Sequence, residues 1–185
     1  SGGGIYCKRA KLNITSSEFI ENYAVTHGGG ILLSKNDNGV GSEAYFSKVL
    51  FVSNESGSSG GALISGDSEF QMINCTIIAN MSSLGGGIYM TGNGFAQAPS
   101  NKIINTIMDD NTGYAIYVVG ETSYQTRLDI SYSNIVGGIS QVSGPIQNEV
   151  HWLEGNIDSD PLFVESEEGN NYNLSINSPC IDAGD

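Results

Sequence analysis

Apolar residues in this chain occur in short alternating runs, each bounded by glycine, serine or asparagine. Runs of three to five residues with a period of two indicate short β-strands, and the residues between them exclude long helices. Such strands cannot each bury a face alone, so the pattern predicts strands that stack on copies of themselves. The apolar positions of two such runs are Leu12, Ile14, Phe19 and Phe70, Met72, Ile77.

Two sequence elements repeat in a constant phase. A glycine-containing element ends in an aliphatic anchor every 23–32 residues. Its copies are Gly3-Gly4-Ile5, Gly29-Gly30-Ile31, Gly61-Ala62-Leu63 and Gly86-Gly87-Ile88, with weaker copies at Tyr114-Ala115-Ile116 and Gly137-Gly138-Ile139. Between them lies a second element, two apolar residues, a variable residue and an asparagine, which ends at Asn22, Asn54, Asn80 and, in altered form, Asn111. This period predicts one coil of a three-sided solenoid, with neighbouring coils about 4.8 Å apart.

Stacked coils give each repeated residue type a role. Glycine allows close backbone approach and a positive φ at a corner. The asparagines can turn inward and form an amide ladder, or they can face solvent in separate turns. Asn54 and Asn80 match the N-x-Ser/Thr pattern, as do Asn13, Asn74 and Asn173. Because Asn54 and Asn80 belong to the repeat, we interpret them as structural and not as glycan acceptors.

The predicted fold is therefore all-β, a right-handed single-stranded parallel β-helix (a solenoid) with a C-terminal cap. Residues 1–145 are expected to form the rungs, with more rungs upstream of residue 1, and residues 146–185 the cap of the same domain. A cap would cover unpaired strand edges that otherwise invite aggregation. Its apolar residues are Trp152, Leu153, Leu162, Phe163, Leu174, Ile176 and Ile181.

The paired repeats resemble those of the chlamydial polymorphic outer-membrane proteins, which are surface adhesins, over residues 2–91. The C-terminal strings resemble the terminal segment of large secreted bacterial β-helix proteins of the pectate-lyase-like group. They are Asn156 to Phe163, Asn171-Tyr172-Asn173-Leu174 and Ser178 to Asp185. The two resemblances imply export and an extracellular or cell-surface location, and they imply no particular substrate.

The net charge and the apolar content of the chain limit the kinds of partner that we expect. Seven basic and twenty acidic residues give a net charge of −13, which argues against nucleic acid and anionic lipid. No run of 18 apolar residues occurs, so no membrane insertion is expected. The three cysteines, Cys7, Cys75 and Cys180, lack metal-site spacing and are interpreted as small buried hydrophobes.

Two insertions at the same phase mark a candidate binding surface. Ser34 to Glu43 contains Asn36 and Asp37, and Thr91 to Ser100 contains Phe95. Equivalent positions of a solenoid lie along one edge, so these loops are expected to flank a shallow groove, with Asp67 and Glu69 beside it. A polysaccharide or a host or cell-surface glycan is the expected partner. Two harmless surface insertions would give the same pattern.

Candidate chemistry is sparse. Asp109 stands where the other copies have the apolar residues Ile20, Val52 and Ile78, and Asp110 follows it. The pair is a weak catalytic candidate. Neighbouring side chains of a strand point to opposite faces, so the two carboxylates would converge only if the strand bends there. Calcium is the only cofactor considered, with oxygen ligands from Asp37, Asp67, Asp158 and Asp160. Lys35, Lys102 and Arg127 are the nearest candidate bases, no basic cluster is visible, and His27 and His151 are interpreted as structural.

Two functional hypotheses follow. The first is a surface module for adhesion, glycan binding or structural support. The second is a fragment of a polysaccharide lyase or glycoside hydrolase of the pectate-lyase-like group, which would need carboxylates and a base converging in one groove.

Overall fold

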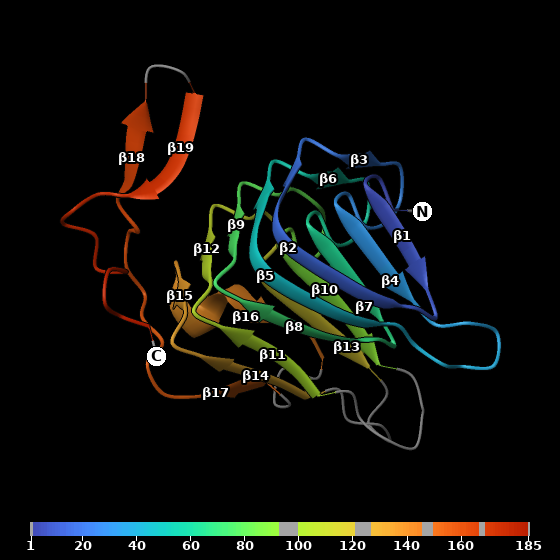
Figure 1. Cartoon of the computed structure of the whole chain (residues 1–185). Coiled ribbons are helices and arrows are strands. Elements are labelled where there is room, and N and C mark those ends of the chain that lie inside the picture. The colour runs from blue at the N-terminus through green and yellow to red at the C-terminus, as the bar shows by residue number, and fades with distance from the viewer. Residues whose placement is uncertain (1, 93–99, 121–126, 146–149, 167–168, 185) are drawn as a thin grey trace.

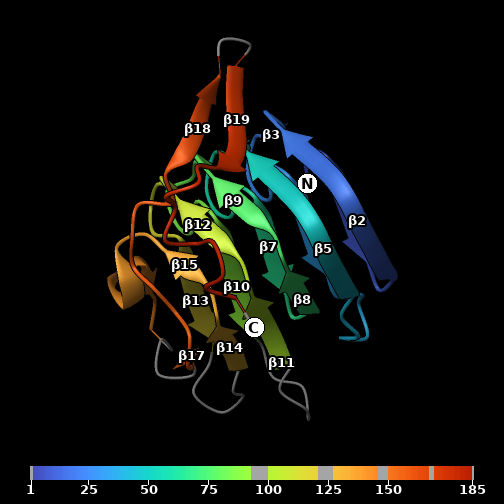
Figure 2. The same ribbon diagram turned by 60° about the vertical axis from the view of Figure 1, so that its left-hand side comes forward.

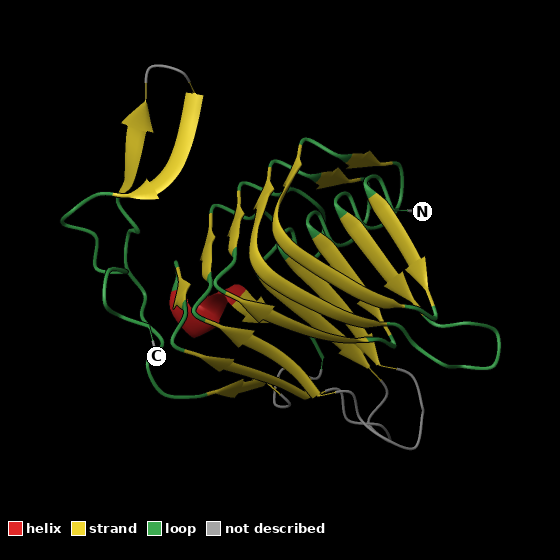
Figure 3. Ribbon diagram, viewed as in Figure 1, coloured by secondary structure: helices red, strands yellow, loops and turns green. Residues whose placement is uncertain are grey.

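A computed structural model of the chain describes residues 2–92, 100–120, 127–145, 150–166 and 169–184. Strands are the main regular secondary structure of the described residues, and loops connect them (Figure 3). One 3₁₀ helix, η1 (Gly138–Gln141), lies among the described residues.

Two sheets make up the body, and both curl around one core (Figure 1). Sheet A has the strand order β1 (Ile5–Lys8), β4 (Ile31–Ser34), β7 (Leu63–Gly66), β10 (Ile88–Gly92), β13 (Ile116–Gly120), β16 (Val142–Ser143). Each strand comes from the next copy of the repeat, and every pairing is parallel. The predicted anchors are confirmed as one in-register column: Ile5, Ile31, Leu63, Ile88, Ile116.

Sheet B divides into two arms, because β5 (Glu43–Val52) is long enough to pair with two later strands. At its other edge β5 pairs with β2 (Lys11–Ile20). One arm continues through β8 (Glu69–Ile73), β11 (Ser100–Ile104), β14 (Arg127–Ser131) and β17 (Val150–Trp152), and the other through β9 (Thr76–Ile78), β12 (Ile107–Asp109) and β15 (Asn134–Ile135). The strands β3 (Tyr23–Ala24) and β6 (Glu55–Ser56) form a separate small parallel pair.

The prediction that Gly137-Gly138-Ile139 forms the last copy of the glycine element is wrong. Ile139 lies in η1 and is 53% exposed, and Val142 takes its place in register with Ile116. Gly137 and Gly138 have φ of 88° and 60°, so two consecutive left-handed residues turn the chain away from the strand direction.

The core consists of inward columns shared by successive strands. Phe19 stacks on Phe51 with ring centroids 5.1 Å apart, and Phe46 meets Phe51 edge to face. Aliphatic side chains of both sheets fill the space between them, and Ile77, Met90, Met108 and Ile116 are completely buried. Cys7 and Cys75 are buried free thiols, which confirms the interpretation made for those two residues.

The inward asparagine ladder is confirmed. Asn22 Nδ2 donates to Asn54 Oδ1 at 2.8 Å, Asn54 Nδ2 to Asn80 Oδ1 at 2.9 Å, and Asn80 Nδ2 to Asn111 Oδ1 at 3.0 Å. Asn54 and Asn80 are fully buried, so neither amide is presented as a glycan acceptor.

Glycine has two different roles in its repeat. The residue immediately before four of the copies has a left-handed φ, between 61° and 66°, at Gly28, Gly60, Gly85 and Gly113. The next residue needs close approach: a Cβ on Gly61 would lie 2.4 Å from the Gly86 carbonyl oxygen. Corners elsewhere use other residues in the left-handed region, and one such column is Ser16, Lys48, Asn74, Asn105, Tyr132.

The C-terminal segment contacts the stack and also leaves it. Val150 and Trp152 pack on the core, whereas Leu153, Leu162, Ile176 and Ile181 are between 39% and 89% exposed. Beyond Trp152 the chain runs along the corner beside β12 and β15. The antiparallel hairpin β18 (Phe163–Ser166) and β19 (Gly169–Leu174) then extends away from the body (Figures 1 and 2).

Candidate functional site

A hollow of about 580 Å³ lies where the first long loop leaves sheet A. Strands β1 and β4 supply one side of it, and the loop after β4 supplies the other. Its lining residues are Tyr6, Lys8, Ser34, Lys35, Asn36, Asp37, Asn38 and Gly39. Two of the predicted binding residues, Asn36 and Asp37, therefore lie in a concave site.

Hydrogen bonds within the loop fix its conformation. Asn36 Oδ1 accepts from the Val40 amide at 2.8 Å, and the Asn36 amide donates to the Val40 carbonyl at 2.9 Å. Gly39, with φ of 83°, closes the turn by donating to the Asn36 carbonyl. This turn presents the side chain of Asp37, which is 96% exposed.

Two ion pairs fix the lysines of the hollow. Lys8 Nζ lies 3.0 Å from Asp37 Oδ1, and Lys35 Nζ lies 2.8 Å from Asp67 Oδ2. The hydrogen bond that Lys8 donates to Asp37 raises the pKa of Lys8, so this ammonium stays charged. Asp67, of which only 8% is exposed, is at a left-handed corner with φ of 48°.

These pairings leave the predicted calcium ligands apart. Asp37 and Asp67 face different lysines, Asp158 Oδ1 accepts from the Gly137 amide, and Asp160 Oδ1 accepts from the Leu162 amide. Within the described ranges, no three His, Cys, Asp or Glu side chains are grouped so as to hold a metal ion.

The second wall of the predicted groove cannot be compared. Phe95 lies outside the described residues, as does most of its loop. Glu69 is half-buried in register with Glu43, on the outer face of sheet B.

An outward column of sheet A runs from this hollow along the stack. Tyr6, Leu32, Ile64, Tyr89 and Tyr117 are in register on successive strands. The rings of Tyr89 and Tyr117 stack with centroids 5.9 Å apart. Tyr6, 53% exposed, ends the column at the hollow, so an aromatic ring lies beside charged and amide groups.

Asp109 lies in the column predicted for it, in register with Ile78. Strand β12 ends there, and Asp110 has a left-handed φ of 50°, so the chain does bend between the two carboxylates. Burial is the main cause that raises the pKa of Asp109, and the charges of Asp110 and Asp160 raise it further. The same corner position is held by Glu21, Ser53 and Ala79 in other coils, which accounts for Asp110 as a corner residue.

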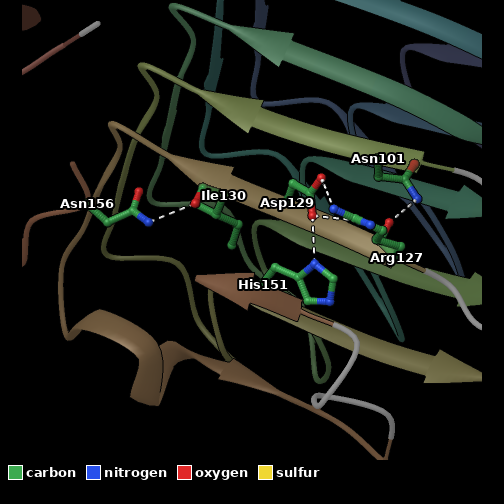
Figure 4. Close-up of polar contacts among 6 residues, drawn as sticks. All are labelled: Asn101, Arg127, Asp129, Ile130, His151 and Asn156. Atoms are coloured by element: carbon green, nitrogen blue, oxygen red, sulfur yellow. Dashed lines mark hydrogen bonds and ion pairs between the residues drawn. The ribbon is translucent and has the colours of Figure 1, made fainter. Parts of the chain in front are cut away.

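The structure also brings together residues that the sequence kept apart. Arg127 Nε and Nη2 donate to the two oxygens of Asp129 at 2.8 and 3.0 Å, and His151 Nδ1 lies 3.0 Å from Asp129 Oδ1 (Figure 4). Arg127 holds the pKa of Asp129 below its usual range, and His151 acts in the same direction. The contact with Asp129 is compatible with the structural role predicted for His151, and it brings His151 and Arg127 to one carboxylate although the sequence showed no basic cluster.

Register explains this cluster. Lys102, Asp129 and His151 are neighbours on the outer face of sheet B, each on the next strand of the sheet. In sequence they are more than twenty residues apart, a spacing that matches no short motif but does match the period of the repeat. Recognising the repeat period in this column is the signal that could have found it.

Comparison with protein-family models, with curated proteins and with solved structures finds no significant match. No helix in the described part of the chain has the length and apolar character needed to cross a membrane.

Proposed function

We propose that this chain is a right-handed parallel β-helix module of an extracellular or cell-surface protein, and that it binds glycan through the hollow at Tyr6. Each copy of the repeat adds one strand to sheet A and either one long strand or two short strands to sheet B, which supports a helical coil as the repeating unit. The adhesin-like repeats and the C-terminal strings support export. Structural support and adhesion are compatible with the same architecture.

The observation that carries the proposal is the exposed Tyr6 ring within a hollow lined by lysine, aspartate and asparagine side chains. Sugar rings have apolar faces that pack on aromatic rings, and their hydroxyl groups pair with such donors and acceptors. Sites for small ligands combine an apolar surface with a few placed polar groups in this way. The net charge of −13 favours an uncharged glycan here.

Binding of neutral polysaccharides, measured by affinity electrophoresis and calorimetry, tests the proposal. Tyr6→Ala should weaken binding about 3- to 10-fold, the loss expected for one aromatic contact. Tyr45→Ala, which removes a 38% exposed tyrosine from sheet B, is the matched control and should change nothing. Equal affinities for wild type and Tyr6→Ala would contradict the proposal.

A lyase or hydrolase is the second candidate, and the raised pKa of Asp109 is the observation that favours it. A carboxyl group that holds its proton to higher pH suits a general acid. Cleavage of polysaccharides, with and without calcium, tests this candidate. Activity that disappears in Asp109→Ala would establish it over the binding module.

A further inference from the structure

A second polar site lies on the outer face of sheet B, separate from the hollow at Tyr6. Asp129 is central in it, with Lys102 on the preceding strand and His151 on the following one. Arg127 lies two residues before Asp129 on the same face of β14. Three basic side chains therefore gather on one face of a chain with only seven lysine and arginine residues.

The carboxylate at the centre is already occupied. Asp129 is 14% exposed and accepts three hydrogen bonds, two from Arg127 and one shared with His151. An ionised Asp129 holds the proton of a neutral His151 on Nδ1, which leaves the lone pair on Nε2. This pairing fixes the orientation of both basic groups and neutralises the carboxylate.

Binding capacity remains on all three basic residues. The guanidinium of Arg127 has five N–H donors and uses two of them on Asp129, and the side chain is 50% exposed. His151 is 38% exposed, and its Nε2 has no partner in the part of the chain that the structure describes. The Lys102 ammonium likewise has no partner among the described residues, although it lies one strand from Asp129.

We propose that Lys102, Arg127 and His151 form a site for an oxyanion group, a carboxylate or a sulfate, carried by an acidic polysaccharide. Lys102 and His151 are two strand spacings apart, about 10 Å, and the long flexible stem of lysine spans part of that distance. Asp129 is a positioning residue that keeps Arg127 and His151 in place (Figure 4). This proposal does not rest on glycan binding at Tyr6, because the two sites lie on different sheets.

In the described part of the chain, His151 is paired with Asp129, Arg127 contacts the same carboxylate, and Lys102 lies one strand further. A protonated imidazole keeps its hydrogen bond to Asp129 and presents a second N–H at Nε2. That N–H would donate to the bound oxyanion.

The test measures binding of the intact chain to heparin as the sulfated probe, polygalacturonate as the carboxylated probe and dextran as the neutral one. Wild type should bind one or both acidic probes, and binding should weaken with salt. Lys102→Ala and His151→Gln should each lower affinity for these probes about fivefold or more.

Lys48→Ala is the matched control, since Lys48 is an exposed lysine at a left-handed corner of β5, outside the register column of Lys102, Asp129 and His151. Unfolding curves confirm that each variant is folded, and the His151 ring signals in NMR, titrated with sulfate and acetate, report binding independently. Equal affinity of Lys102→Ala and wild type, or an equal loss in Lys48→Ala, overturns the proposal. Neutral glycan that fails to bind at Tyr6 leaves this result unaffected.

Discussion

At the residue scale, the buried asparagines are the side chains on which most hydrogen bonds converge. The side chain of Asn80 donates to Phe51, Ile78 and Asn111, and its Oδ1 accepts from the backbone and side-chain amides of Asn54. A buried polar group left without a partner costs about 1–3 kcal/mol. The ladder is therefore worth more to the folded state than any surface polar contact.

Asn80→Ala should lower the free energy of unfolding by about 2–4 kcal/mol, because it leaves several buried groups unsatisfied. Urea unfolding followed by circular dichroism measures the change. Asn13→Ala, at an exposed asparagine of β2, serves as the control and should stay within about 0.5 kcal/mol. A loss below 1 kcal/mol in Asn80→Ala would show that the ladder contributes little.

Asp109, unlike the buried asparagines, is expected to destabilise the folded state at neutral pH, because folding disfavours its ionised form. A carboxyl with a raised folded pKa destabilises the protein as pH rises from the unfolded pKa, about 3.9, through the folded one. Asp109→Asn should therefore raise Tm at pH 7 by about 2 °C. This advantage should disappear as pH falls below about 4. Thermal melts at pH 3, 5 and 7 measure it, and a constant difference across this range would contradict the sign.

At the element scale, turns and register decide how each strand enters the stack. The glycine element brings strand ends so close that a side chain has no room. Gly61→Ala should lower stability by about 2 kcal/mol or more, because its Cβ would meet three backbone atoms within 3 Å. Gly184→Ala is the control, since the nearest contact of its Cβ is a side-chain oxygen at 3.2 Å. Similar unfolding midpoints for both variants would refute the close-approach role.

Strands β14 and β17 are joined by Asp129, whose folded pKa is lowered by Arg127 and His151. A lowered carboxyl pKa contributes stability above the unfolded value of about 3.9, and this contribution is lost as pH falls through the folded value. Asp129→Asn should cost at most about 1 kcal/mol at pH 7. The cost should vanish in acid, and paired urea titrations at pH 7 and 3 check this. An undiminished cost at pH 3 would assign the effect to packing.

At the scale of the whole molecule, charge opposes compaction. The chain has a net charge of −13, and four lysine or arginine ion pairs occur among the described residues. Salt screens both the repulsion among the excess acidic groups and the attraction within the ion pairs. We expect the loss of repulsion to be the larger effect. Raising NaCl from about 0.02 to 0.5 M should therefore raise the unfolding midpoint, and a lower midpoint would mean that the ion pairs dominate.

Prediction from sequence succeeded where the repeat is regular. The anchors of β1, β4, β7, β10 and β13 followed from spacing, because strands paired in parallel place equivalent residues of successive repeats in register. It failed at Ile139, where Gly137 and Gly138 have a left-handed backbone and the chain forms η1 in place of the expected strand. The candidate site was found only in part: Asn36 and Asp37 line the hollow, whereas Tyr6 and the Arg127–Asp129–His151 cluster were missed.

The sequence by itself determined the all-β architecture and the phase of its strands, because a short period and the alternation of polar and apolar residues are local properties. Whether the repeated asparagines face inward was decided by the structure, in which Asn54 and Asn80 are buried. Only the tertiary structure decided which polar residues meet. Lys102, Asp129 and His151 become neighbours through register between coils. Tyr6 joins Asn36 and Asp37 because a loop folds back on an earlier strand. Contacts between distant residues depend on the number of residues in each corner and loop. The repeat pattern does not fix that number.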